Sequence, residues 1–243
     1  MVVRVQFEVE ETAVTVVAEP QFVKTAKDSI FDTREIIKRF IRQDPFFLHT
    51  LEPYIPPSLS PPIIVRMCEA AGKAGVGPMA TVAGVIADEA VSAMVKAGAG
   101  QAIVDNGGDI ALHLTEPEEV GLYAGESKLT GLGFHCEPRE DAFGICTSSG
   151  TVGPSISFGI ADAATVVSGD VTLADACATL LGNLVGSRKE EVLRQALETV
   201  CSISGVEGAM VVVGGSLAMK GSLPELTESK VSMGRIAKRR LVF

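Results

Sequence analysis

Asp175 and Thr179 are the two side chains whose types and spacing first suggest chemistry in this chain. They are four residues apart in an alanine-rich stretch that favours a helix, so they share one helix face. A carboxylate and a hydroxyl are hard oxygen ligands of the kind that Mg²⁺ or Ca²⁺ takes. The alternative is that Asp175 only opposes the helix dipole, a contact of about 0.3–1 kcal/mol, so that Asp175→Ala would leave the fold intact.

Two further polar groups follow β-rich stretches. The first group lies in the middle of Ala102–Leu114, between two β-rich segments. This order of strand, glycine turn and strand predicts a hairpin. The second follows a predicted strand at Ala142–Cys146, and its hydroxyls could donate to phosphate or ribose oxygens or could close a local turn. The first group is Asn106, Gly107, Gly108 and Asp109, and the second is Thr147, Ser148, Ser149 and Gly150.

A glycine-rich entry precedes the longest helical run of the chain. Gly75 and Gly77 come before Pro78, and proline is well tolerated at the first helical position, so we expect a helix from near Pro78 to about Lys96. The backbone N–H groups at such a helix start suit a phosphate or a carboxylate. The alternative is that small residues, including Ala83 and Gly84, only let the helix lie close to a sheet.

Composition and charge restrict the classes of function. The chain has 243 residues, a net charge of -9 and 47% hydrophobic residues. An acidic protein is a poor general partner for nucleic acid, because phosphate binding relies on basic surfaces. No run of about 18 uncharged apolar residues predicts a membrane span, and the acidic N-terminal stretch argues against a targeting peptide. We therefore expect a cytoplasmic location without membrane or nucleic-acid partners.

The five cysteines are odd in number and widely spaced, without a CxxC pair. This pattern argues against a disulfide framework or a zinc site. Small core residues are the expectation for all five. They are Cys68, Cys136, Cys146, Cys177 and Cys201.

Periodicity predicts a series of short elements. Residues 44–62 contain six prolines and are expected to form a strap on the surface, while Ile63–Lys73 is compatible with a strand or a helix. The hairpin expected at Gly208–Met219 repeats the pattern of the first one, which suggests a duplicated β/α lobe. The other expected elements are strands at Val2–Val9, Ala13–Ala18, Gly121–Gly125 and Ala164–Ser168, and helices at Asp28–Arg42, Leu173–Val185 and Lys189–Ser202, the last opened by a capping box of Ser187 and Glu190.

Four stretches occur in a fixed order: MATVAGVIAD (Met79–Asp88), IVDNGGDI (Ile103–Ile110), ICTSSG (Ile145–Gly150) and ATVVSGDVTLADACATLLGN (Ala164–Asn183). Together they resemble the ApbE-type flavin transferase superfamily, whose enzymes use Mg²⁺ to split FAD and attach FMN to a Thr or Ser of a target protein. The resemblance implies one α+β domain over residues 1–229, with antiparallel or mixed sheets and packed helices. The lysines and arginines at 230–243, without an acidic residue, separately predict a basic tail. It implies that Asp175 and Thr179 are metal ligands, that Asn106–Asp109 line a flavin nucleotide pocket and that Thr147–Gly150 lie beside it.

Two positions depart from the superfamily pattern. Ala83 stands where the flavin transferases carry a lysine, and no histidine occurs between Gly150 and Ala174, where they carry an HxxDP segment. Transfer to a hydroxyl needs a general base within reach. One hypothesis is therefore an Mg²⁺-dependent enzyme acting on FAD, FMN or a related nucleotide. The alternative is a non-catalytic protein that binds a nucleotide or a small anion, and the apolar strap suggests a homodimer.

Overall fold

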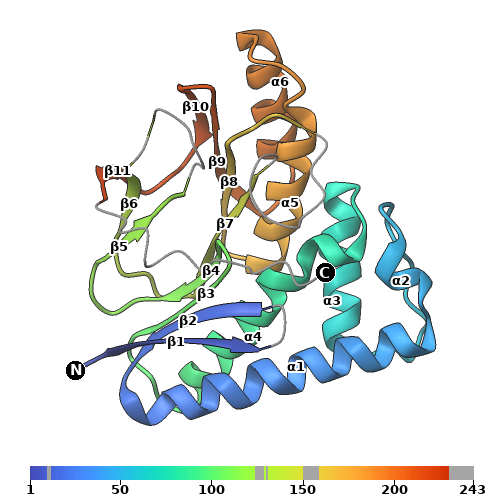
Figure 1. Cartoon of the computed structure of the whole chain (residues 1–243), viewed down its shortest axis with the longest axis vertical. Helices are drawn as coiled ribbons and strands as arrows, with labels where there is room; N and C mark the ends of the chain where they lie inside the picture. Colours follow the sequence, from blue (N-terminus) through green and yellow to red (C-terminus); the bar gives the residue numbers. More distant parts are fainter. Residues whose placement is uncertain (10–11, 124–128, 130, 150–158, 230–243) are drawn as a thin grey trace.

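An eight-stranded antiparallel sheet forms the centre of the computed structural model, which describes residues 1–9, 12–123, 129, 131–149 and 159–229 (Figure 1). Gly150 and the predicted basic tail at 230–243 lie outside the described residues. The strands of the main sheet, in spatial order, are β1 (Val3–Val9), β2 (Thr12–Ala18), β3 (Ala102–Asn106), β4 (Asp109–His113), β7 (Phe143–Ser148), β8 (Ala163–Ser168), β9 (Val206–Val213) and β10 (Ser216–Gly221).

A smaller antiparallel sheet covers one face of the main sheet. Its strands, in spatial order, are β11 (Glu225–Glu228), β6 (Leu132–Cys136) and β5 (Glu118–Gly121). The sequence predicted neither β6 nor β11, and it placed the strand near β5 too late, at Gly121–Gly125. Leu112, Phe134 and Phe143 belong to one buried apolar cluster that joins the two sheets.

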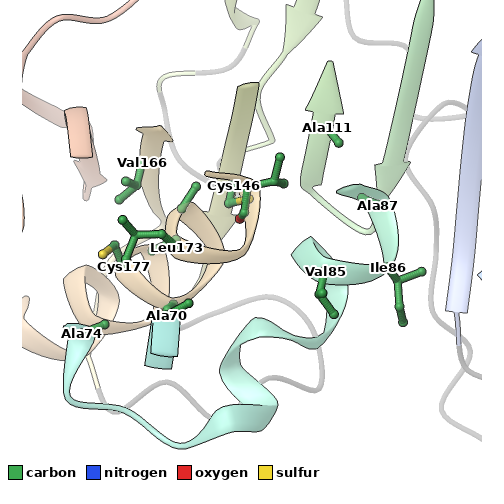
Figure 2. Close-up of a cluster of buried hydrophobic side chains, with 14 of the residues drawn as sticks. Ala70, Ala74, Val85, Ile86, Ala87, Ala111, Cys146, Val166, Leu173 and Cys177 are labelled. Atoms are coloured by element: carbon green, nitrogen blue, oxygen red, sulfur yellow. The ribbon is translucent and has the colours of Figure 1, made fainter. Parts of the chain in front are cut away.

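The helices cover the opposite face of the main sheet, where α4 and α5 contact the strands directly (Figure 1). Apolar side chains of α4, α5 and the facing strands form the larger core cluster, which includes Val85, Cys146 and Leu173 (Figure 2). The helical elements are η1 (Pro20–Phe22), α1 (Val23–Gln43), α2 (Phe46–His49), α3 (Pro62–Ala74), η2 (Pro78–Thr81), α4 (Val82–Lys96), α5 (Val171–Leu184) and α6 (Glu190–Cys201).

The two halves of the main sheet have the same order of elements. The first half consists of the hairpin β1–β2, the helices α1 to α4 and the hairpin β3–β4, and the second consists of β7–β8, α5–α6 and β9–β10. In each half the four strands lie side by side in sequence order. This arrangement agrees with the duplicated β/α lobe that the two similar hairpins suggested.

The segment left open at Ile63–Lys73 is helical. Pro62 is the first residue of α3, and Ile64, Met67, Ala71 and Ala74 are buried at the three- and four-residue spacing of a helix face. The predicted capping box before α6 is wrong, because Lys189 is the N-cap residue and its side chain makes no capping bond. Helix α1 also begins five residues earlier than the predicted Asp28.

Among the described residues, one helical segment, Pro78–Lys96, is long and apolar enough to cross a membrane by length and composition alone. More than half of that segment, 56%, is buried inside the protein, where α4 packs against α1, α5 and β3. Its hydropathy is therefore accounted for by burial in the core.

Candidate functional site

Polar side chains gather on the helix-facing side of the main sheet, where the β3–β4 turn meets the end of β7. Asn106 is paired with Asp109 in the β3–β4 ladder, and Asp109 is paired with Cys146 in the β4–β7 ladder. Because side chains alternate along a strand, these residues share the face of Ala111, which packs in the helix-side core. Ser148 shares this face, being two residues after Cys146.

The β3–β4 turn is the predicted two-residue glycine turn. Gly107 has φ 73° and Gly108 has φ 105°, which is left-handed backbone that glycine adopts without strain. The Gly108 N–H donates to Asp105 Oδ1 at 3.0 Å, and the Thr147 N–H donates to the Gly108 carbonyl at 3.1 Å. Burial raises the pKa of the Asp105 carboxyl. Asp105 therefore fixes the turn from the other face of the sheet, a role that the sequence did not reveal.

Asn106 connects this turn to the start of α4. Its side-chain Nδ2 donates to the Ala83 carbonyl at 3.0 Å, and the residue is 2% exposed. A buried amide without a partner costs about 1–3 kcal/mol, so breaking this bond is unfavourable. The bond therefore holds β3 and α4 at a fixed distance.

Asp175 connects the same helix start to α5. Its Oδ2 accepts the Gly84 N–H at 2.7 Å, and the residue is 8% exposed. Gly84 is the third residue of α4, so its N–H is among the four that lack an acceptor within the helix, and it lies at the positive end of the helix dipole. The carboxylate of α5 thus caps α4, and Asp175 supports the fold more strongly than a dipole contact with its own helix would.

Helices α4 and α5 approach each other closely at Gly84. A Cβ added at this residue would lie 2.7 Å from Asp175 Cβ and 2.9 Å from the Val171 carbonyl oxygen. Gly84 therefore allows a close approach, but to helix α5 and not to the sheet that the sequence suggested, and this approach brings Asp175 to the Gly84 N–H.

Cys146 lies at the base of the site. Burial raises the pKa of its thiol well above the usual value, and the nearby carboxylates of Asp109 and Asp175 raise it further. The thiol donates to the Val171 carbonyl at 3.6 Å. It is consequently a protonated, neutral group at physiological pH and not a thiolate nucleophile.

The predicted hydroxyl group divides between the two faces of the sheet. The Thr147 side chain lies on the face opposite to Cys146 and forms a hydrogen bond of 3.0 Å with the Thr165 hydroxyl. Ser148 is partly exposed on the helix-facing side, and Ser149, also partly exposed, follows the end of β7. Thr147 therefore contacts the glycine turn through its backbone N–H, while its hydroxyl points away from the site.

Thr179 is partly buried on α5, one turn after Asp175. Together these residues offer two hard oxygen donors. The described part of the chain contains no group of three His, Cys, Asp or Glu side chains that could hold a metal ion. Because Mg²⁺ keeps several waters and is commonly held by one or two carboxylates together with substrate phosphates, a magnesium site here would need donors beyond this pair.

All five cysteines are free, and four of them are buried as the sequence predicted, while Cys201 is half-buried. The three histidines lie away from the site. His113 ends β4, at the opposite end from Asp109, His135 lies in the smaller sheet and His49 is exposed at the end of α2. None of the three histidines therefore lies on β7, α4 or α5, three of the elements that carry candidate site residues.

The arrangement of sheets and helices is that of the ApbE-type fold. The ApbE protein of Thermotoga maritima aligns with a TM-score of 0.58 at 12% identity, covering 98% of this chain and 100% of that chain. The flavinyl transferase ApbE of Pseudomonas stutzeri aligns with a TM-score of 0.56 at 12% identity, covering 91% of this chain and 94% of that chain. At these identities, the likeness defines the class of fold.

Sequence comparison gives the particular family. The chain belongs to the family described as AbpE bacteria, whose pattern matches residues 2–240. It is 48% identical to the UPF0280 protein of Methanosarcina acetivorans over 237 residues, which is 97% of this chain and 93% of that relative. It is also 48% identical to the UPF0280 protein of Methanocella arvoryzae over 233 residues, which is 96% and 94% of the two chains. The resemblance predicted from the four stretches is thus confirmed.

Proposed function

We propose that this protein binds FAD or a related flavin nucleotide with Mg²⁺, at the site between the β3–β4 turn, the end of β7 and the start of α4. One observation carries the proposal. The hydrogen bonds from Asn106 to Ala83 and from Gly84 to Asp175 connect the first, second and fourth of the stretches that resemble flavin transferases. Ser148, from the third stretch, lies on the same face of the sheet.

Each side chain has a distinct part in this proposal. Asp175 and Thr179 would hold Mg²⁺, which supplies neutralisation of the charge on a pyrophosphate. Ser148 donates its hydroxyl to a phosphate or ribose oxygen, and the two glycines leave the turn open to a ligand because they carry no Cβ. Asn106 keeps β3 and α4 in register, so it positions the site rather than contacting the ligand.

Hydrolysis of the pyrophosphate is the chemistry that this site supports best. Transfer to a threonine needs a general base for the accepting hydroxyl, and the three histidines lie elsewhere. Hydrolysis depends mainly on charge neutralisation and a positioned water. The second candidate, binding without catalysis, is favoured by Ala83, which occupies the position of the superfamily's lysine, and by the lack of a histidine on β7, α4 or α5 as the structure describes them.

Calorimetric titration with FAD, FMN and ADP, each with and without Mg²⁺, tests the proposal. We expect FAD to bind more tightly when Mg²⁺ is present. If FAD binds and FMN and AMP accumulate over hours, the protein is a hydrolase, and if FAD stays intact, it is a binding protein. The absence of heat with all three ligands would contradict both candidates.

Two neighbouring hydroxyls provide a matched test of the site's location. Ser148→Ala removes the hydroxyl on the helix-facing side and is expected to weaken FAD binding by roughly tenfold, the value of one hydrogen bond to a charged oxygen. Thr147→Ala removes the hydroxyl on the opposite face and should leave the FAD affinity unchanged. Equal losses in the two variants would place the ligand elsewhere.

A further inference from the structure

The strap at residues 44–62 displays an unusual concentration of exposed apolar side chains. Eleven large hydrophobic residues are exposed among the described residues, and five of them fall within Phe46–Leu59. Ile55 is 91% exposed and Leu59 is 97% exposed. The five residues, called the strap face from here on, are Phe46, Leu48, Leu51, Ile55 and Leu59.

The strap is held firmly against the rest of the protein. Tyr54 packs edge-on against Phe40 and Phe47, with ring centroids 6.3 Å and 5.3 Å away, and its hydroxyl donates to Asp44 Oδ2 at 2.5 Å. The backbone at Thr50 lies so close to Gly77 that a Cβ on Gly77 would be 2.0 Å from the Thr50 carbonyl oxygen. The first part of the strap face is therefore presented by an ordered support, which reduces the entropy lost when a partner binds.

The strap face is almost uncharged. Glu52 is the single Asp, Glu, Lys or Arg among the fourteen residues from Phe46 to Leu59, which also include His49, in a chain with a net charge of -9. Two copies of an acidic protein repel each other over most of their surfaces, and this repulsion is smallest where their neutral faces meet. Anionic membranes and nucleic acids attract basic surfaces instead, and this segment contains no lysine or arginine.

The area of the strap face matches that of a stable interface. The exposed fractions of its five residues correspond to roughly 600 Å² of apolar surface within one fourteen-residue segment. A standard interface buries about 800 Å² on each partner, of which roughly 60% is apolar. A twofold dimer that joins two strap faces would bury an apolar area of about this size on each copy without any other contact.

We propose that the strap face is the interface of a homodimer, in which the occupant is the same face of a second copy of this chain. A twofold axis makes such an interface self-complementary, so neutral apolar residues meet neutral apolar residues. The strap also supports η2 through Gly77, and η2 leads directly into the α4 start that contains Gly84. The dimer therefore stiffens the strap that packs on the segment leading into α4.

Sedimentation and light scattering of the full chain test the proposal at micromolar concentrations. We expect a mass twice the 25.4 kDa of one chain. The double variant Ile55→Glu with Leu59→Glu places like charges on both sides of the axis and should raise the dimer dissociation constant at least about 100-fold, leaving a monomer. Both positions are more than nine-tenths exposed, so the circular dichroism and unfolding midpoint of the monomer should remain native.

Met219→Glu is the matched control, because Met219 is 52% exposed on β10, outside the strap. This variant should remain a dimer. A native chain that stays monomeric would overturn the proposal, and so would a dimer that persists in the double variant. A monomer that binds neutral phosphatidylcholine vesicles through Ile55 and Leu59 would also overturn it, by assigning the face to lipid.

Discussion

Gly84→Ala provides the sharpest test of how the candidate site is assembled. In an isolated helix this substitution stabilises by about 0.5–1 kcal/mol, because alanine loses less backbone entropy on folding. In this protein the new Cβ would lie 2.7 Å from Asp175 Cβ and 2.9 Å from the Val171 carbonyl oxygen. Both neighbours belong to the rigid helix α5, so the two helices must separate.

The balance of these effects can be worked out from the structure. Inserting a methyl group into a tightly packed contact costs about 1–3 kcal/mol. Separation of the helices also lengthens the 2.7 Å bond from the Gly84 N–H to Asp175, and a hydrogen bond to a charged group contributes about 1.5–3 kcal/mol. After subtraction of the helix-propensity gain, we expect Gly84→Ala to destabilise the protein by about 2–5 kcal/mol.

Urea unfolding followed by circular dichroism measures this difference, with Gly72→Ala as the control. Gly72 lies in α3, and a Cβ added there meets no atom within 4 Å. This control should therefore raise the stability by about 0.5–1 kcal/mol, opposite in sign to Gly84→Ala. A Gly84→Ala variant as stable as the native protein would refute the close approach of α4 and α5 from which the site is inferred.

Three other outcomes are expected. Asp175→Ala leaves a buried N–H without an acceptor and should lower the unfolding free energy by about 1–3 kcal/mol. Asp175→Asn retains an acceptor, so it should mainly remove the Mg²⁺ dependence of FAD binding, which calorimetry would show. Equal stability losses in the two variants would contradict the capping role of Asp175. Asn106→Ala should cost about 1–3 kcal/mol in urea unfolding, and an unchanged midpoint would mean that its bond to α4 is dispensable. The hydrogen bond to Glu119 raises the pKa of His135 above 6.5, so the imidazolium that pairs with Glu119 is lost only as the pH rises through the raised pKa; NMR titration should show a lower pKa in Glu119→Gln, and an unchanged pKa would exclude Glu119 as the cause.

The helices and hairpins near the candidate site were largely predictable from the sequence because their signals are local. The two-glycine turn has a short-range signature and needs no partner to be recognised. Aspartate is a preferred N-cap residue type, and the Asp170 carboxylate does accept the Leu173 N–H at the start of α5. The strands β6 and β11 were missed because they are short, with five and four residues. They pair with each other although β11 begins only at Glu225, so no local signal marks the pair.

The predicted capping box failed for a related reason. Ser187 and Glu190 have the spacing of the motif, but Lys189 is the N-cap, and the Ser187 hydroxyl accepts only the Lys189 N–H, at 3.5 Å. A motif of this kind depends on which residue has the first helical backbone angles, and a shift of two residues is enough to remove it.

The sequence by itself determined the class of elements, the membership of the family and the residue types that could bind a flavin nucleotide and a metal. Only the tertiary structure decided which of them meet. Thr147 and Ser148 are neighbours in sequence, yet the alternation of a strand places their hydroxyls on opposite faces of the sheet. Asp175 and Gly84 are 91 residues apart, and they meet because a residue without a side chain lets α5 approach α4 closely enough for a carboxylate to cap it.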